Sequence, residues 1–156
     1  EGNPGGWDGS SIKSFEDLWT LSPGETVDVD IWLTDLPEAL LTAGFLITYD
    51  PALVNITNVV PNDTDNGGPW DAGLTSSFEV DPGNPGQWFL AVGNFSCVAP
   101  DGDGDILLAT VTFECQGPGN ADIAISTIPG FDTVVDCVDI SGSITAGAVS
   151  LDVRVF

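Results

Sequence analysis

The stretch DGDGD at residues 101–105 places three carboxylates on alternate residues of a glycine-rich turn. This spacing lets one loop wrap a hard cation such as calcium, which prefers oxygen ligands. The stretch is not an EF-hand loop, because Ile106 and Thr112 replace the glycine and the bidentate glutamate of that pattern. The alternative is a solvated acidic turn, but a net charge of −22 favours a cation that relieves the repulsion among acids. We therefore expect calcium at Asp101, Asp103 and Asp105.

Three cysteines lie 18 and 22 residues apart, a spacing that matches neither a zinc ribbon nor a redox Cys-x-x-Cys pair. In an exported protein two of them would form a disulfide, and the third would be buried, free or paired with a neighbouring chain. In a reducing cytosol all three would be small buried hydrophobes. The sequence leaves the pairing open among Cys97, Cys115 and Cys137.

Two further sets of residues bear on glycans. N-glycosylation sequons begin at Asn55, Asn62 and Asn94, and they matter only if the source organism glycosylates exported asparagine. The chain also has five tryptophans, and an exposed tryptophan can stack on a sugar or insert into a partner. Burial against a second sheet, a neighbouring subunit or the glycine-rich loops is the plainer explanation of the tryptophans.

The inventory for catalysis is poor. With no histidine, the chain has no common general base, no Ser-His-Asp triad and no Cys-His pair. No carboxylate pair stands out among the 24 acidic residues. We therefore expect no enzymatic activity. We also expect no nucleic-acid partner, because Lys13 and Arg154 are the only cations and cannot form a basic patch.

The elements that position these residues are expected to be strands. The 156 residues suit one domain, and 19 glycines and 11 prolines favour turns between strands. Alternation is explicit in TVDVDIWLT, where Val27, Val29, Ile31 and Leu33 would face a core. We predict strands at residues 26–34, 42–49, 53–60, 86–92, 106–114, 122–127, 133–138 and 143–156.

This pattern predicts an all-β chain with a single β-sandwich of about eight or nine strands, of jelly-roll or immunoglobulin-like type. Residues 1–11 are glycine-rich and polar except for Trp7, so we expect a flexible N-terminal arm before a sandwich domain at residues 12–156. The predicted core is Val27, Val29, Ile31, Leu33, Phe45, Ile47, Tyr49, Leu107, Ala109, Val111 and Phe113.

Three stretches resemble the cohesin family of bacterial extracellular β-sandwiches. They are PGETVDVDIWLTDLP at residues 23–37, TAGFLITYDPALVNITNVVP at residues 42–61 and DGDGDILLATVTFE at residues 101–114. The resemblance runs from about residue 23 to residue 114 and implies a cohesin-like subtype of the sandwich. It also implies a non-catalytic module that binds dockerins through one sheet face.

The chain termini suggest self-assembly. Sandwich edge strands expose unpaired backbone groups, which monomers often blunt with lysine, and this chain has one lysine. Either terminus would add a strand to the next subunit, and repetition of this head-to-tail contact builds a fibre or pilus-like filament. Calcium would screen the repulsion between such subunits. The alternative is that both termini complete their own sheet. The expected contact residues are Trp7, Ile12, Phe15, Trp19, Leu151, Val153 and Val155.

We thus expect an extracellular structural protein, a subunit of a fibre or a surface layer, with a second copy of itself as partner. The alternative function is a monomeric recognition module for a dockerin-type protein or a glycan. The chain begins at Glu1 without a basic, apolar leader, so we expect a secretion signal that has already been removed. No apolar run reaches the roughly 18 residues of a membrane span, so we expect none.

Overall fold

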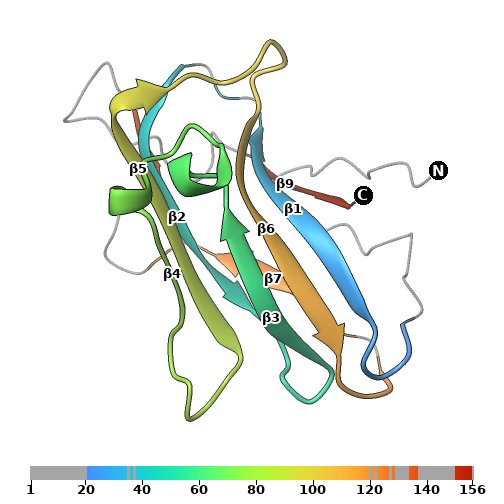
Figure 1. The fold of residues 1–156 in the computed structure, drawn as a ribbon. Coiled ribbons are helices and arrows are strands. Elements are labelled where there is room, and N and C mark those ends of the chain that lie inside the picture. The colour runs from blue at the N-terminus through green and yellow to red at the C-terminus, as the bar shows by residue number, and fades with distance from the viewer. Residues whose placement is uncertain are drawn as a thin grey trace.

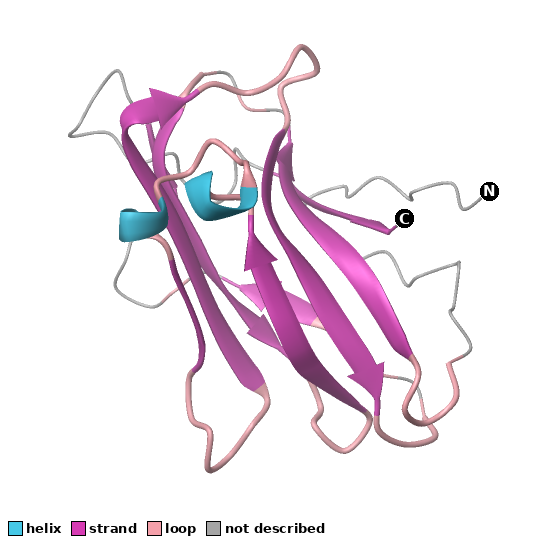
Figure 2. Cartoon of the chain, in the orientation of Figure 1, coloured by secondary structure: helices cyan, strands magenta, loops and turns pink. Residues whose placement is uncertain are grey.

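The structure is a computed structural model that describes residues 21–34, 36, 38–119, 121, 123–126, 128, 134–136 and 150–155. Two antiparallel sheets pack face to face, and two short 3₁₀ helices lie at one end of them (Figures 1 and 2). This confirms the predicted all-β sandwich. The predicted arm at residues 1–11, with Trp7, and the predicted contacts Ile12, Phe15 and Trp19 lie outside the described residues.

We call the two sheets A and B. Sheet A has the order β3-β6-β1-β9, and sheet B has the order β4-β5-β2-β7, with β8 also paired to β2. The strands of sheet A are β3 (Val54–Pro61), β6 (Ile106–Cys115), β1 (Thr26–Thr34) and β9 (Ser150–Val155). Those of sheet B are β4 (Ser76–Glu79), β5 (Gln87–Val98), β2 (Leu40–Thr48), β7 (Ala124–Ser126) and β8 (Val134–Asp136).

The predicted strands agree best with the structure in the first two thirds of the chain. The strand at residues 26–34 has the predicted bounds, whereas β5 continues to Val98 instead of ending at residue 92. β7 and β8 have three described residues each, inside the predicted ranges 122–127 and 133–138, and β4 is a further strand that the sequence does not predict. β4 reads SSFE, too short for an alternation of apolar and polar residues to stand out.

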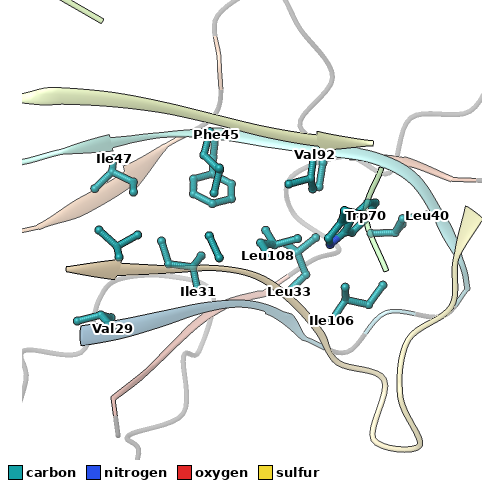
Figure 3. Close-up of a cluster of buried hydrophobic side chains, with 14 of the residues drawn as sticks. Val29, Ile31, Leu33, Leu40, Phe45, Ile47, Trp70, Val92, Ile106 and Leu108 are labelled. Carbon is teal, nitrogen blue, oxygen red and sulfur yellow. The ribbon is translucent and has the colours of Figure 1, made fainter. Parts of the chain in front are cut away.

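The core lies between the sheets, as the alternation in β1 predicts. Val29, Ile31 and Leu33 of β1 point inward against Phe45 and Ile47 of β2, and all five are buried (Figure 3). Successive side chains of a strand point to opposite faces, so the intervening Asp28 and Asp30 point away from the core. Burial of this one apolar face is the main force that holds the sheets together.

One predicted core residue is wrong. A β-bulge interrupts the pairing of β1 with β6, so that Ile31 lies opposite Ala109 and the next residue, Trp32, lies opposite Leu107. The extra residue, Leu108, takes the inward position and is fully buried, while Leu107 is only partly buried. Strict alternation along residues 106–114 cannot reveal this change of phase.

The last strand completes sheet A within the chain. β9 pairs antiparallel with β1, with Leu151, Val153 and Val155 opposite Leu33, Ile31 and Val29. The sequence had left this arrangement open as the alternative to strand donation. Contact of these three residues with another subunit therefore stays a prediction. Within the described ranges, no helix has the length and hydrophobicity that a bilayer crossing requires.

Candidate functional site

Among the side chains that the structure describes, the outer face of sheet B has none that is charged at the positions that the register turns away from the core. Phe78 lies opposite Phe89, which lies opposite Leu46 on the next strand, and the intervening Leu90 is buried. Alternation along each strand then defines this surface, which we call face B. It comprises Ser76, Phe78, Gln87, Phe89, Ala91, Gly93, Thr42, Gly44, Leu46, Thr48, Ala124 and Ser126.

A stacked aromatic pair lies at the β4 edge of face B. The rings of Phe78 and Phe89 have centroids 4.8 Å apart and planes inclined by 20°. Phe78 keeps 50% of its surface exposed. Val80 follows β4 and donates its N–H to the carbonyl of Gln87 at 2.9 Å, so it extends the same apolar edge. A soluble protein rarely leaves such a set of aromatic and aliphatic side chains uncovered without a use for it.

The chain itself covers part of face B through two glycines. A Cβ added to Gly44 would lie 3.2 Å from Cδ1 of Ile128, and one added to Gly93 would lie 3.3 Å from Cβ of Leu74. Ile128 and Leu74 thus pack against backbone where a side chain would otherwise stand. Leu74 belongs to the 3₁₀ helix η2 (Ala72–Leu74). The uncovered part of face B therefore lies toward β4 and the hairpin that joins it to β5.

The inner side of β4 is polar and fixes this edge strand in place. The Tyr49 hydroxyl donates to Oε1 of Glu79 at 2.8 Å, and Nε1 of Trp88 donates to Oγ of Ser77 at 2.8 Å. Burial, together with the hydrogen bond and the negative charge of Glu79, raises the pKa of Tyr49 to about 12. The carboxylate of Glu79 consequently serves the interior contact with Tyr49 and leaves face B uncharged.

The outer face of sheet A, which we call face A, is acidic. Oδ1 of Asp28 accepts a hydrogen bond from the Thr112 hydroxyl at 2.7 Å, and Oδ1 of Asp30 accepts one from the Thr110 hydroxyl. Each pair joins residues that face each other across β1 and β6, and Glu114 extends the acidic row. The other outward positions of face A in the described side chains are Thr26, Trp32, Leu107, Asn55, Asn58 and Val60.

A tryptophan from a loop closes one end of the core beside Leu40 (Figure 3). Trp70 is fully buried, and its Nε1 donates to the carbonyl of Leu107 at 3.1 Å. The loop also contains η1 (Thr64–Asn66), which begins where the Asp63 side chain accepts from the Asn66 N–H. The sequence alone does not decide whether Trp70 is buried or contacts a partner, because a tryptophan within a Gly-Pro loop belongs to no periodic pattern that would show which way its side chain points.

The acidic turn at residues 101–105 is organised by one of its own carboxylates. Oδ1 of Asp101 accepts from the N–H groups of Asp103 and Asp105 at 2.9 and 3.0 Å. Asp103 is exposed, whereas Asp105 is buried. Among the described residues, no three acidic or cysteine side chains are arranged as a metal site. Calcium binding at this turn therefore stays a prediction.

The remaining predicted sites are spread over the molecule. Cys115 is a free, buried thiol, and Cys137 lies outside the described residues, so a disulfide among the three cysteines stays a prediction whose pairing the sequence leaves open. Of the sequon asparagines, Asn55 is on β3, while Asn62 and Asn94 donate through Nδ2 to the carbonyls of Leu107 and Pro69 at 3.1 and 2.7 Å. Glycosylation at these positions stays a prediction.

The comparison with solved structures identifies the fold. The third ScaC cohesin, in complex with the ScaB dockerin, from Acetivibrio cellulolyticus, matches with a TM-score of 0.56 and 16% identity over 80% of this chain and 83% of that one. CaCohA2 from Clostridium acetobutylicum matches in its solution structure with a TM-score of 0.52 and 19% identity, over 73% of this chain and 70% of that one.

CaCohA2 in its complex with a variant of CaDoc0917 also matches, with a TM-score of 0.52 over 73% of this chain and 77% of that one. No protein-family model matches the chain, and neither does any curated protein sequence. These likenesses confirm the predicted cohesin-like β-sandwich. They concern the fold, because the identities are 16–19%.

Proposed function

We propose that this chain is a non-catalytic, extracellular protein-binding module that takes a dockerin-type partner on face B. The observation that carries the proposal is the uncharged outer surface of sheet B in a chain of net charge −22. Two of the cohesin structures similar in fold are complexes with a dockerin, which supports a partner of that type. The proposal is thus a recognition module and not the self-assembling filament that the sequence first suggested.

Desolvation supports the choice of face B over face A. An interface must strip water from the groups that it buries, and an unpaired buried carboxylate costs several kcal/mol. Face A would bring Asp28, Asp30 and Glu114 into the interface. Face B offers instead the Phe78 and Phe89 rings, and aromatic residues are enriched at the centres of protein interfaces.

Binding to a panel of purified dockerin domains, including CaDoc0917 and the ScaB dockerin, tests the proposal. We expect the wild-type protein to bind at least one of them in biolayer interferometry. Phe78→Asp should weaken that binding by about 100-fold or more, because it places a charge within the apolar part of the contact. Absence of binding to every dockerin by the folded wild-type protein would refute a dockerin-type partner.

Val60→Asp is the matched control for this substitution. Val60, like Phe78, is an exposed apolar residue on an edge strand; it is 37% exposed and lies on face A. We expect Val60→Asp to bind within about twofold of wild type, as for a surface substitution away from the interface. If both variants lose binding equally, face B is not the docking surface.

A further inference from the structure

The strand β5 carries a wide irregularity next to face B. Gly93 pairs with Thr42 and Val98 pairs with Leu40, so residues 94–97 lie opposite Leu41 alone. Such bulges re-aim the side chains that they carry. Within this bulge Phe95 is 79% exposed, the highest exposure among the large hydrophobic residues of the described chain.

The bulge is held by specific contacts. Oδ1 of Asn94 accepts from the N–H of Ser96 at 2.8 Å, and Nδ2 of the same side chain donates to the carbonyl of Pro69 at 2.7 Å. Cys97 has a φ of 63°, in the left-handed region that disfavours every residue but glycine and a few polar ones. The chain thus holds an unfavourable backbone conformation beside an exposed phenylalanine, a combination typical of functional sites.

Phe95 lies within reach of a partner seated on face B. Phe89 and Phe95 are six residues apart on β5, which corresponds to about 20 Å or less at the usual strand rise. Ala91 and the Leu74 side chain above Gly93 lie between them. An interface of standard size covers about 800 Å² on each partner, roughly 28 Å across, so one footprint includes both phenylalanines.

We infer that Phe95 is a second anchor for the dockerin-type partner, separate from the Phe78 and Phe89 pair. The inference rests on the proposed function, because it assigns a further residue to the same interaction. Exposed aromatic residues that enter a partner's pocket carry much of the binding energy of an interface.

Charge complementarity specifies what surrounds the apolar part of the partner's contact surface. The chain carries 24 acidic residues against two cations, so a partner experiences a strongly negative field around the uncharged face. Lysine and arginine must therefore surround that apolar part. A second copy of this chain does not satisfy the requirement, because it carries the same net charge of −22.

The test compares four variants against a dockerin that the wild-type protein binds. Phe95→Ala should weaken the affinity by about 10- to 100-fold, as truncation of an anchoring aromatic does, and Phe95→Leu should restore part of it. Val60→Ala on face A and Phe78→Asp on face B are the controls, with unchanged and abolished binding expected. The melting temperature of Phe95→Ala should equal that of wild type, because the side chain is exposed.

The outcomes separate the inference from the proposed function. If Phe78→Asp loses binding while Phe95→Ala binds like wild type, the second anchor is refuted and face B stands. If no dockerin binds the wild-type protein, the proposed function fails and the anchor fails with it. The wild-type affinity should also fall as sodium chloride rises from about 50 to about 500 mM. An affinity independent of salt would refute the lysine and arginine residues expected around the partner's contact surface. Dimerisation through Phe95 would overturn the inference and identify a second copy of this chain as the occupant.

Discussion

Faces A and B are built from the same fold element, an antiparallel sheet with one buried side, yet their outer surfaces differ in chemistry. Face A pairs the aspartates of β1 with the threonines of β6, so its acids are held by neighbours in the same sheet. Face B places a stacked phenylalanine pair and small uncharged residues in the corresponding positions. Among the described side chains, the acidic residues on the outer faces of the two sheets therefore lie on face A.

This difference indicates on which face a partner can displace water with the smaller desolvation free energy. Charged groups must be desolvated or paired on binding, whereas aromatic and small side chains release poorly bound water. The acids of face A and of the loops then act at a distance, through the field that orients an approaching partner. One face is suited to contact and the rest of the surface to steering.

The largest effect on stability is expected at the loop that is hydrogen-bonded to both sheets. Trp70 donates to the Leu107 carbonyl of β6, and the adjacent Asp71 N–H donates to the Gly93 carbonyl of β5 at 2.9 Å. Trp70→Ala should lower the free energy of unfolding by about 3–5 kcal/mol, as for other large-to-small core substitutions. Urea denaturation measures it, with the exposed Phe95→Ala as a control that should stay within about 0.5 kcal/mol of wild type.

Alkaline pH should weaken the hydrogen bond between Tyr49 and Glu79 that holds β4, the edge strand of face B. The pKa of Tyr49 is raised in the folded state from 10.0 to about 12, so folding favours the neutral phenol. That stabilisation is complete below about pH 10 and is lost as the pH rises through about 12, a change of about 2–3 kcal/mol for a buried group. Unfolding free energies at about pH 9 and about pH 11.5 should therefore differ more for wild type than for Tyr49→Phe. Equal differences would contradict the role of this residue.

The connection between the sheets, from β5 to β6, offers a test of calcium. Asp101→Ala removes the acceptor of two turn hydrogen bonds and should cost about 1–2 kcal/mol, whereas Asp101→Asn keeps an oxygen acceptor but loses the charge. If calcium binds here, it should raise the melting temperature of wild type and not that of Asp101→Asn. Superimposable melting curves of wild type in calcium and in chelator would show that residues 101–105 form an acidic turn that binds no calcium.

The smallest effect is expected on face A. Thr112→Val keeps the shape of the side chain but removes the hydroxyl that donates to Asp28. Because this hydrogen bond is exposed, we expect a loss of at most about 1 kcal/mol in thermal denaturation and no change in dockerin affinity. A large loss of affinity would show that face A takes part in binding after all.

The sequence predicts face A better than face B, for a physical reason. Apolar and acidic residues alternate in β1, so the direction of each side chain follows from its type. In β5 the run Phe89, Leu90, Ala91 and Val92 is apolar throughout, and only the register shows that Phe89 and Ala91 point outward. The bulges at Leu108 and at residues 94–97 likewise depend on pairing between distant strands. Face B therefore emerges only once three strands are brought side by side.

The order of the strands in each sheet also has a consequence for how the chain folds. Face B includes β4 and β5, which are neighbours along the chain and form a hairpin, whereas β1 pairs only with β6 and β9 among the described strands, both remote in sequence. Closing a long loop costs more entropy than closing a short one, and distant pairings slow folding. In pulse-labelled hydrogen exchange, the amides of the β4–β5 hairpin should gain protection first and those between β1 and β9 last. Face B would then form before the acidic sheet A is completed.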